Sequence, residues 1–240
     1  LDIYGPSLPI VLGVNQQPEM TKDNRLLPLE KFGMKVMSFG FISGNDTPVI
    51  WRGPLVSRMT EQFFKDVDWG ELDFLILDLP PGTGDVQLTL TQKLRISGAI
   101  IVTTPQDIAL SDVRKGADMF KKVKTPILGV IENMSGFSIN GAVKTSNGDL
   151  LNGGELHLSD ESKIKISDSG NFEINIDLFK KGGGASESKR LNIPLLGQIP
   201  ISSAVVDSTD NGVPIVHSIP NHKTSIIYKT IIDQIISILD

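Results

Sequence analysis

The stretch FLILDLPPGTGD, residues 74–85, decides the fold class of this chain. Its first half is a short apolar run that carries Asp78 near its end, and its second half is a turn with two prolines and two glycines. Uninterrupted apolar runs of this length are typical of strands that are buried on both faces of a parallel sheet. We therefore predict a buried strand over residues 74–79 that brings Asp78 to its carboxyl end.

Further apolar runs follow along the chain. Residues 99–102 and 127–131 end in polar or Gly/Pro turns, and residues 193–200 supply another short strand. Helical patterns lie between these runs. The alternation predicts an α/β fold with a mainly parallel sheet and helices on both faces. In open folds of this class, ligands bind at the carboxyl ends of the strands.

Three helical patterns each carry an apolar stripe. The first begins at Gly53-Pro54, a pair suited to a helix start, and continues with Leu55, Met59 and Phe63. The other two stripes consist of Val113, Ala117 and Phe120, and of Tyr228, Ile231, Ile232, Ile235, Ile236 and Leu239. The C-terminal helix has few basic residues on its opposite face, so we predict that it packs on the sheet and not on a membrane.

Residues 138–181 interrupt the alternation of strands and helices. Turn signals occur there at Asn140-Gly141, Asn147-Gly148 and Ser169-Gly170-Asn171. Apolar residues also alternate with polar ones, at Ile164, Ile166, Phe172, Ile174 and Ile176. This pattern predicts a β-hairpin or small meander. We interpret residues 138–181 as a β-rich insertion in one domain that covers residues 1–240, with residues 180–184 (KKGGG) as a flexible return.

The composition limits the classes of function. A formal net charge of -5 gives no overall basic field, so we expect no binding to nucleic acid. No apolar run reaches the ~18 residues of a membrane span and the first residues lack a signal peptide, so we predict an intracellular protein without membrane association. The absence of cysteine excludes disulfides, thiol nucleophiles and thiolate ligands. The three histidines, His157, His217 and His222, lack metal-ligand spacing.

The turn that follows Asp78 is only superficially similar to a nucleotide-binding loop. A P-loop needs a lysine and a serine or threonine after its last glycine, and here Asp85 and Val86 stand in those places. A better interpretation is an acidic strand end that holds magnesium through water, followed by a switch turn in which the amide of Gly82 meets a γ-phosphate. The alternative is that Asp78 only caps the next turn.

Other candidate site residues lie at the ends of predicted elements. Asp2 either orients an attacking water or touches magnesium, or it serves as an N-cap or Asx-turn residue. Arg52 lies at a helix start, where the helix dipole disfavours a cation, so it is a candidate partner for an anion or a carboxylate. An ordinary surface arginine is the alternative. Asn133 follows residues 127–131, and its amide can both donate to and accept from a purine edge, or cap the strand end.

Taken in order, several segments resemble the Mrp/ApbC family of deviant P-loop ATPases, the iron–sulfur cluster carrier proteins. The resemblance covers nearly all of residues 1–137 and 182–216, and it looks closest to the mitochondrial and alphaproteobacterial branch. The segments that carry it are LDIYGPSLP (1–9), VIWRGPLV (49–56), VDWGELDFLILDLPPGTGDVQLTLTQ (67–92), TTPQDIALSDVRKGADMFKKV (103–123), PILGVIENMSGF (126–137) and IPLLGQIP (193–200).

The resemblance implies a MinD-like P-loop NTPase fold and an ATP-bound homodimer with two nucleotides near the subunit interface. It implies that Asp2 is the first switch aspartate and that Asp78 is the Walker B aspartate that holds magnesium, so that both are catalytic. It further implies that Gly82 is the second-switch glycine and that Asn133 and Pro200 contact the nucleotide.

The chain departs from the family pattern in two places. It has no phosphate-binding loop, and since it opens at Leu1 without methionine we expect that loop, with its two lysines, upstream. After residues 133–137 the family carries a Cys-x-x-Cys pair that holds an iron–sulfur cluster between two subunits. This chain has no cysteine, so we expect no cluster ligands in it.

Three hypotheses about function stay open. The leading one is an ATP-binding and ATP-hydrolysing iron–sulfur cluster carrier or assembly factor, with ATP and magnesium as ligands and cluster client or assembly proteins as partners. Hydrolysis is expected of the full-length protein and not of this stretch alone. The alternative is a non-enzymatic scaffold that binds a protein partner through residues 138–181. The hypothesis of a partitioning or division-site ATPase is weaker, because YGPS and WRGP are not motifs of that class of protein. We expect the mitochondrial matrix as location, with the cytoplasm as the alternative.

Overall fold

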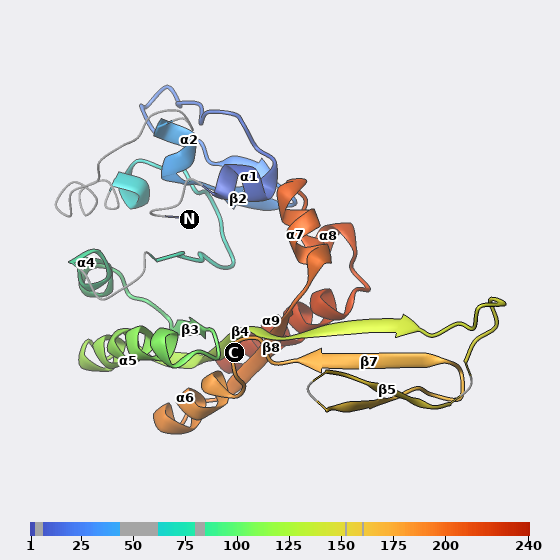
Figure 1. Ribbon diagram of the computed structural model, residues 1–240. Helices are drawn as coiled ribbons and strands as arrows, with labels where there is room; N and C mark the ends of the chain where they lie inside the picture. The colour runs from blue at the N-terminus through green and yellow to red at the C-terminus, as the bar shows by residue number, and fades with distance from the viewer. Residues whose placement is uncertain (3–6, 44–61, 80–84, 152, 160) are drawn as a thin grey trace.

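The computed structural model describes residues 1–2, 7–43, 62–79, 85–151, 153–159 and 161–240. Short helices and strands of the N-terminal third precede an α/β unit, from which a pair of long strands extends (Figure 1). In chain order the elements are α1 (Leu8–Leu12), β1 (Leu29–Lys31), β2 (Met34–Val36), α2 (Phe39–Ser43), α4 (Asp85–Lys93), β3 (Ala99–Thr103), α5 (Asp107–Lys122), β4 (Ile127–Ala142), β5 (Glu155–His157), β6 (Lys163–Lys165), β7 (Asn171–Ile176), α6 (Gly183–Leu191), β8 (Leu195–Ile201), α7 (Ser203–Asp210), α8 (Ile215–Ser218) and α9 (Lys223–Leu239).

The central sheet is built on β4, which pairs with three other strands. β3 and β8 run parallel to the first part of β4 on its two edges, and β7 runs antiparallel to its second part. The predicted strands at residues 99–102, 127–131 and 193–200 are therefore present. The predicted α/β class, with a parallel central part, is confirmed.

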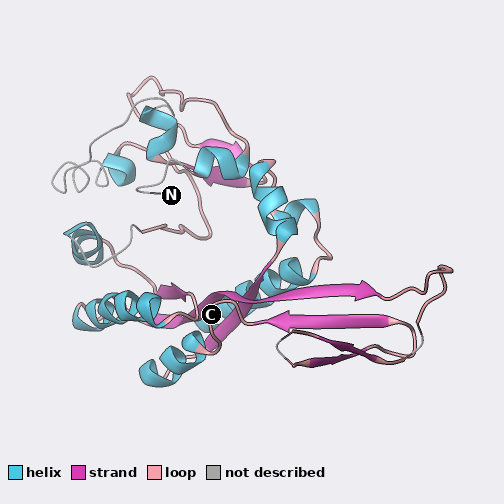
Figure 2. Cartoon of the chain, in the orientation of Figure 1, coloured by secondary structure: helices cyan, strands magenta, loops and turns pink. Residues whose placement is uncertain are grey.

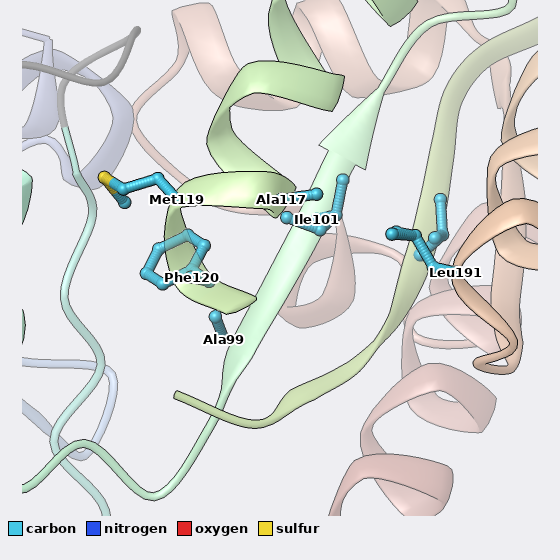
Figure 3. Packing of buried hydrophobic residues seen from close by; sticks show 7 residues of the cluster. Ala99, Ile101, Ala117, Met119, Phe120 and Leu191 are labelled. Atoms are coloured by element: carbon cyan, nitrogen blue, oxygen red, sulfur yellow. The ribbon is translucent and has the colours of Figure 1, made fainter. Parts of the chain in front are cut away.

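Helices cover both faces of this sheet. On one face α5 and α6 pack on β3 and β4 (Figure 3) through Ala99, Ile101, Ala117, Met119, Phe120, Val130 and Leu191. On the other face α9 packs on β8, where Ile231 is buried against Leu196 and Ile199. Successive side chains of a strand point to opposite faces, so Val130 of β4 belongs to the first cluster and Ile131 packs on the second.

The C-terminal helix forms as predicted, with its buried stripe slightly rotated. Ile231 is 2% exposed, whereas Ile232 and Ile236 of the predicted stripe are 48% and 38% exposed. Tyr228 and Ile235 of the predicted stripe pack on the sheet side, and Ile227, which was not part of it, packs there as well. The sequence pattern could not set this rotation because isoleucines occupy both sides of the stripe. Among the described helices none is both long and apolar enough to span a membrane.

The other two predicted helices differ in how much of them is described. The stripe that contains Val113, Ala117 and Phe120 lies in α5, as predicted. The helix predicted after residue 53 is described only at its end, where residues 62–65 are helical. There Phe63 is buried, and its ring centroid lies 4.5 Å from that of Phe39. The predicted start of this helix lies outside the described residues.

The prediction of a buried strand at residues 74–79 is wrong. The backbone nitrogen of Leu1 donates a hydrogen bond to the carbonyl oxygen of Ile76 (2.8 Å), and the amide of Asp78 donates one to the carbonyl oxygen of Leu1 (2.9 Å). Asp2 then forms one parallel bridge with Asp78, and no ladder follows among the described residues. Ile76 is 74% exposed. An apolar run becomes a buried strand only where neighbouring strands pair with it along its length.

The second part of β4 and the whole of β7 form a two-stranded ribbon, called here the arm (residues 137–142 and 171–176). The arm extends away from the helices, and the short hairpin of β5 and β6 lies next to it (Figure 2). The alternating residues at 172–176 therefore form a strand, as predicted. Its partner is β4 and not the nearer β6, a long-range choice that periodicity alone does not encode.

The glycine-rich residues 180–184, interpreted as a flexible return, contain the start of α6. Gly183 and Gly184 are buried there. A Cβ added at Gly183 would lie 2.6 Å from the carbonyl oxygen of Pro105, and one added at Gly184 would lie 2.7 Å from the Cβ of Glu132. These glycines therefore permit close packing of α6 on the sheet, and the interpretation as a flexible return is wrong for them.

Candidate functional site

Asp2 and Asp78 are direct neighbours in the structure. Asp2 forms one parallel backbone bridge with Asp78 and another with Ser38. The side chain of Asp2 is buried, at 8% exposure, and accepts a hydrogen bond from the Ser38 hydroxyl (Oγ to Oδ2, 3.3 Å). Asp78 is exposed. The backbone thus brings a buried and an exposed carboxylate from distant parts of the sequence to one place.

The pKa of Asp78 is raised above its ordinary value. Partial burial is the largest cause, and the nearby charge of Asp2 adds to it. Because the charge of Asp2 disfavours ionisation of Asp78, a cation beside the two side chains would stabilise the ionised form of Asp78.

The chemistry of this pair fits a magnesium ion. Mg²⁺ is usually bound through one or two carboxylates together with water and the phosphates of a nucleotide, and not by a complete protein cage. Asp2 and Asp78 supply oxygen ligands of this kind. Within the described ranges no group of three or more His, Cys, Asp or Glu side chains forms a fuller metal site.

Asn133 and Pro200 lie on neighbouring strands, β4 and β8. Asn133 pairs with Ile199, the residue before Pro200, and residues 134–136 then bulge out of the ladder. Pro200 lies opposite this bulge, where its lack of an N–H leaves no donor unpaired. The Oδ1 of Asn133 accepts the amide N–H of Met134 (2.9 Å). Its carbonyl oxygen therefore caps the strand end, and a contact with a base would come from its Nδ2 group.

A polar cluster that the sequence analysis missed adjoins Asn133. Glu132 is fully buried, and its carboxylate accepts hydrogen bonds from Ser135 Oγ (2.6 Å), Gln198 Nε2 (2.7 Å) and the amide of Gly184 (2.6 Å). The signal in the sequence was a glutamate that closes an otherwise apolar run, ILGVIE. A charged residue in such a run indicates that hydrogen-bonding partners surround it in the fold, because burying a charged side chain without partners is costly.

A second buried glutamate ties α6 to α5. Glu187 is 0% exposed and accepts hydrogen bonds from Arg190 (Nε 2.8 Å, Nη2 2.6 Å) and from Arg114 (Nε 3.2 Å). The hydrogen bonds to Glu187 are the largest cause of a raised pKa of Arg190. In the described part of the chain Glu187 shares no hydrogen-bond partner with Glu132.

The aspartate pair and the asparagine–proline pair belong to different parts of the described structure. No described strand ladder joins the Asp2–Asp78 bridge to the sheet of β4. Their connection is apolar, because Leu79 packs both on the cluster around Phe63 and on the cluster around Ile101.

The other two predicted site residues, Arg52 and Gly82, lie outside the described residues. The same holds for the whole turn at residues 80–84. The described structure therefore contains two separate candidate groups, Asp2 with Asp78 and Asn133 with Pro200, and Glu132 adjoins the second group.

The chain matches the sequence model of a family described as ParA, NUBPL iron-transfer P-loop NTPase, over residues 1–169 and 162–236. Among curated proteins, the iron-sulfur protein required for NADH dehydrogenase, mitochondrial, of Arabidopsis thaliana is 37% identical over 235 residues, which are 98% of this chain and 66% of that protein. The iron-sulfur cluster carrier protein of Aquifex aeolicus is 40% identical over 226 residues, 93% of this chain and 54% of that protein. The chain thus spans 54% to 66% of the length of these relatives.

Solved structures share the fold. A nucleotide-binding protein from Archaeoglobus fulgidus in complex with ADP has a TM-score of 0.60 at 30% identity, covering 88% of this chain and 72% of that protein. The cell division ATPase MinD from Pyrococcus furiosus has a TM-score of 0.56 at 19% identity, covering 96% of this chain and 81% of that protein. The latter likeness concerns the fold alone. The expectation of a MinD-like P-loop NTPase fold is confirmed.

Proposed function

The chain belongs to the family of NUBPL iron-transfer P-loop NTPases, and on this basis we propose that it works in an ATP-binding and ATP-hydrolysing iron–sulfur cluster carrier. The observation that supports the proposal is the neighbourhood of Asp2 and Asp78, one buried and one exposed, on two adjoining extended segments. A pair of carboxylates next to each other is suited to magnesium and to a water molecule that attacks a phosphate.

Each acidic residue has one role in this proposal. Asp2 orients the water that attacks the γ-phosphate, and Asp78 holds magnesium through a water molecule. Magnesium, when bound, neutralises charge that develops on the phosphates. The amide of Gly82 meets the γ-phosphate, and Arg52 pairs with an anion or a carboxylate.

The base of the nucleotide is assigned to Asn133 and Pro200. The two residues are adjacent across β4 and β8, and the Nδ2 group of Asn133 is the available donor, since its Oδ1 is engaged by Met134. A ring such as Pro200 offers an apolar surface against which a planar base packs.

The iron–sulfur cluster is the cargo in this proposal, and the residues of this chain do not fit a cluster held by thiolates. The sequence contains no cysteine, whereas such clusters are usually bound by cysteine. The proposal is therefore that a homodimer, whose geometry depends on ATP, binds client or assembly proteins that hold the cluster on ligands of their own. The mitochondrial matrix is the proposed location, with the cytoplasm as the alternative. Residues 138–181 are proposed to be an insertion in one P-loop-type domain.

Nucleotide binding by the complete protein tests the main proposal. Calorimetric titration with ATP is expected to show binding that depends on magnesium, and ATP is expected to raise the midpoint of thermal unfolding. Asp78→Asn should weaken magnesium-dependent binding by about tenfold or more, because a charged ligand is lost. Asp73→Asn, an exposed aspartate in the same segment, is the control and should leave binding unchanged. A complete protein without any nucleotide-dependent heat or stability change would refute the proposal.

A second function, a scaffold that binds a protein partner through residues 138–181, is favoured by the shape and surface of the arm. Phe137 pairs with Ile176 and Ile139 pairs with Ile174, so one face of the arm carries an apolar stripe. Ile139 and Ile176 are 39% and 37% exposed. Partly exposed apolar stripes of this kind are common at protein interfaces.

Charge substitutions on the two faces of the arm test the scaffold function. Ile139→Lys places a charge on the apolar stripe, whereas Asn140→Lys places the same charge on the opposite face. Under the scaffold hypothesis the first variant loses capture of an iron–sulfur assembly protein in a pull-down and the second keeps it, while both retain ATP affinity. Equal capture by both variants would argue against a partner on this stripe.

A further inference from the structure

Glu132 is a buried charged residue to which the proposed chemistry gives no role. It lies in β4, paired with Thr103 of β3 on one side and Gln198 of β8 on the other, and its side chain is 0% exposed. None of the ion pairs formed among the described residues includes it. A sheet interior needs only an apolar side chain at such a position, and a carboxylate there is costly unless donors satisfy it.

Donors from three segments satisfy this carboxylate. Its Oε2 accepts the amide N–H of Gly184 in the first turn of α6 (2.6 Å). Its Oε1 accepts the hydroxyl of Ser135 (2.6 Å) and the side-chain amide of Gln198 (2.7 Å). Gln198 also donates to Ser135 (3.3 Å), which closes the cluster. The approach of α6 depends on Gly184, since an added Cβ would lie 2.7 Å from the Cβ of Glu132.

The cluster holds the backbone on both sides of the asparagine–proline pair. Ser135 lies in the bulge that follows Asn133, and Gln198 lies two residues before Pro200. Met134, the first residue of the bulge, has a φ of 56° and donates its amide to Asn133 Oδ1. A positive φ in a non-glycine residue costs energy and persists where surrounding contacts hold it. The hydrogen bond of Ser135 is such a contact, one residue further along.

We propose that Glu132 is a positioning residue for the base of the nucleotide, because it fixes Asn133 and Pro200 in the arrangement that contacts the base. This inference rests on the nucleotide binding proposed above. Glu132 acts through its neighbours and does not touch the nucleotide. A pre-organised amide loses little freedom on binding. Loss of the cluster therefore weakens the contact with the base and leaves the contacts with the phosphates as they are.

Two substitutions at Glu132 separate its charge from its hydrogen-bonding role. Glu132→Ala removes both acceptor oxygens and leaves the amide of Gly184 without its partner. Glu132→Gln keeps a carbonyl oxygen for Gly184, and its NH₂ group can donate to the hydroxyl of Ser135 while Gln198 turns its own amide. The glutamine variant is therefore expected to rescue the function that the alanine variant loses.

Glu187→Ala is the matched control for a merely structural effect. Glu187 is also a fully buried glutamate that accepts hydrogen bonds, but its partners are Arg114 and Arg190 on the α5 side of α6. The control variant is expected to lower thermal stability without changing the preference for a base.

The experiment compares two ligands on the complete protein, Mg–ATP and Mg–tripolyphosphate, which has the phosphate chain without the base. By competitive titration, Glu132→Ala is expected to lower ATP affinity about tenfold and tripolyphosphate affinity less than about twofold. Glu132→Gln should keep ATP affinity within about threefold of the wild type. Glu187→Ala should leave the ratio of the two affinities unchanged.

The outcomes distinguish this inference from the proposed function. Equal losses for both ligands in Glu132→Ala, or the same change of ratio in Glu187→Ala, would overturn the positioning role and leave nucleotide binding intact. A wild type that binds no ATP would overturn both. Should Glu132→Ala fail to fold, Gln198→Ala takes its place, since it removes one of the three donors. The affinity of this variant for ATP is expected to fall about threefold, while its affinity for tripolyphosphate stays unchanged. Unchanged ATP affinity in the folded Gln198→Ala protein would overturn the inference.

Discussion

The carboxylates of Asp2 and Asp78 are held close enough that the charge of Asp2 disfavours ionisation of Asp78. Partial burial and the charge of Asp2 raise the pKa of Asp78, so the folded chain binds a proton there more readily than the unfolded chain does. Ionised Asp78 therefore destabilises the fold locally, and a bound cation would relieve this. Arrangements of this kind are frequent at binding sites.

Asp78→Asn is expected to make the protein more stable at neutral pH while weakening its magnesium-dependent ATP binding. Because the pKa of Asp78 is raised in the fold, its ionisation destabilises the fold above that pKa. Toward about pH 3 the carboxyl group is protonated in both states and the difference disappears. Urea unfolding should give the variant a higher midpoint at pH 7 and equal midpoints at low pH. A difference that stays constant with pH would contradict this explanation.

Gly184→Ala is expected to destabilise the protein by about 1–3 kcal/mol, because the added methyl group would overlap with Glu132 in a closely packed place. Gly116→Ala is the control. Gly116 lies inside α5 with no heavy atom within 4 Å of an added Cβ, so alanine there should stabilise by about 0.5–1 kcal/mol. Urea unfolding of both variants measures the two effects. The same sign for both would show that close contact at residue 184 is not the cause.

For single residues, the sequence identified candidate site residues better than it predicted their burial and their hydrogen-bond partners. Asp2, Asp78 and Asn133 were recognised as polar residues at the ends of apolar runs. The burial of Asp2 was not predicted, because it depends on Ser38 in a segment far along the chain. Glu132 was overlooked because its three partners come from β8, α6 and the bulge, and no local pattern joins them.

At the scale of single elements, α9 shows how far a periodic pattern determines packing. Its length and its contact with the sheet follow from the repeated isoleucines. Which of them face β8 does not, since Ile231 is 2% and Ile232 is 48% exposed. That choice is made by Gly197 of β8, where an added Cβ would lie 2.7 Å from the side chain of Ile231.

Ile231→Ala is therefore expected to cost about 2–4 kcal/mol of unfolding free energy, because it leaves a cavity between α9 and β8. Ile232→Ala, the same substitution one residue later on the exposed side, should cost less than about 1 kcal/mol. Chemical unfolding of the two variants gives the comparison. Similar losses in both would mean that the helix lies on the sheet with a different face.

Elements that depend on partners far away in the sequence were predicted least well. The apolar run at residues 74–79 has the composition of a buried strand, yet among the described residues it forms one bridge, between Asp78 and Asp2. Conversely, β7 was recognised as a strand but its pairing with β4 was not. Periodicity describes the residues of one segment, whereas a ladder requires a second segment in register.

At the scale of the whole molecule, the arm and the helix-covered sheet differ in how they are stabilised. The sheet is enclosed by α5 and α6 on one face and α9 on the other, whereas the arm rests on the pairing of β4 with β7 and on the neighbouring hairpin. Regions with few buried apolar contacts open at lower free energy than the core.

Amide hydrogen exchange is expected to differ in rate between the arm and the helix-covered sheet. Amides of β7 (Asn171–Ile176) should exchange faster than those of β8 (Leu195–Ile201), because the arm opens without unfolding of the sheet. Mass spectrometry of peptides from the two strands measures the difference. Equal protection of both strands would indicate that arm and sheet unfold as one cooperative unit.

β4 is a single strand of 16 residues that runs from the sheet into the arm. The six residues that it contributes to the arm (137–142) extend about 20 Å beyond the helix-covered sheet at roughly 3.3 Å per residue, a distance comparable to the radius of gyration of about 18 Å expected for a compact chain of this size. The protein should therefore tumble and sediment more slowly than its mass suggests. A solution of it should scatter X-rays as an anisometric particle, with a tail of long interatomic distances supplied by the arm.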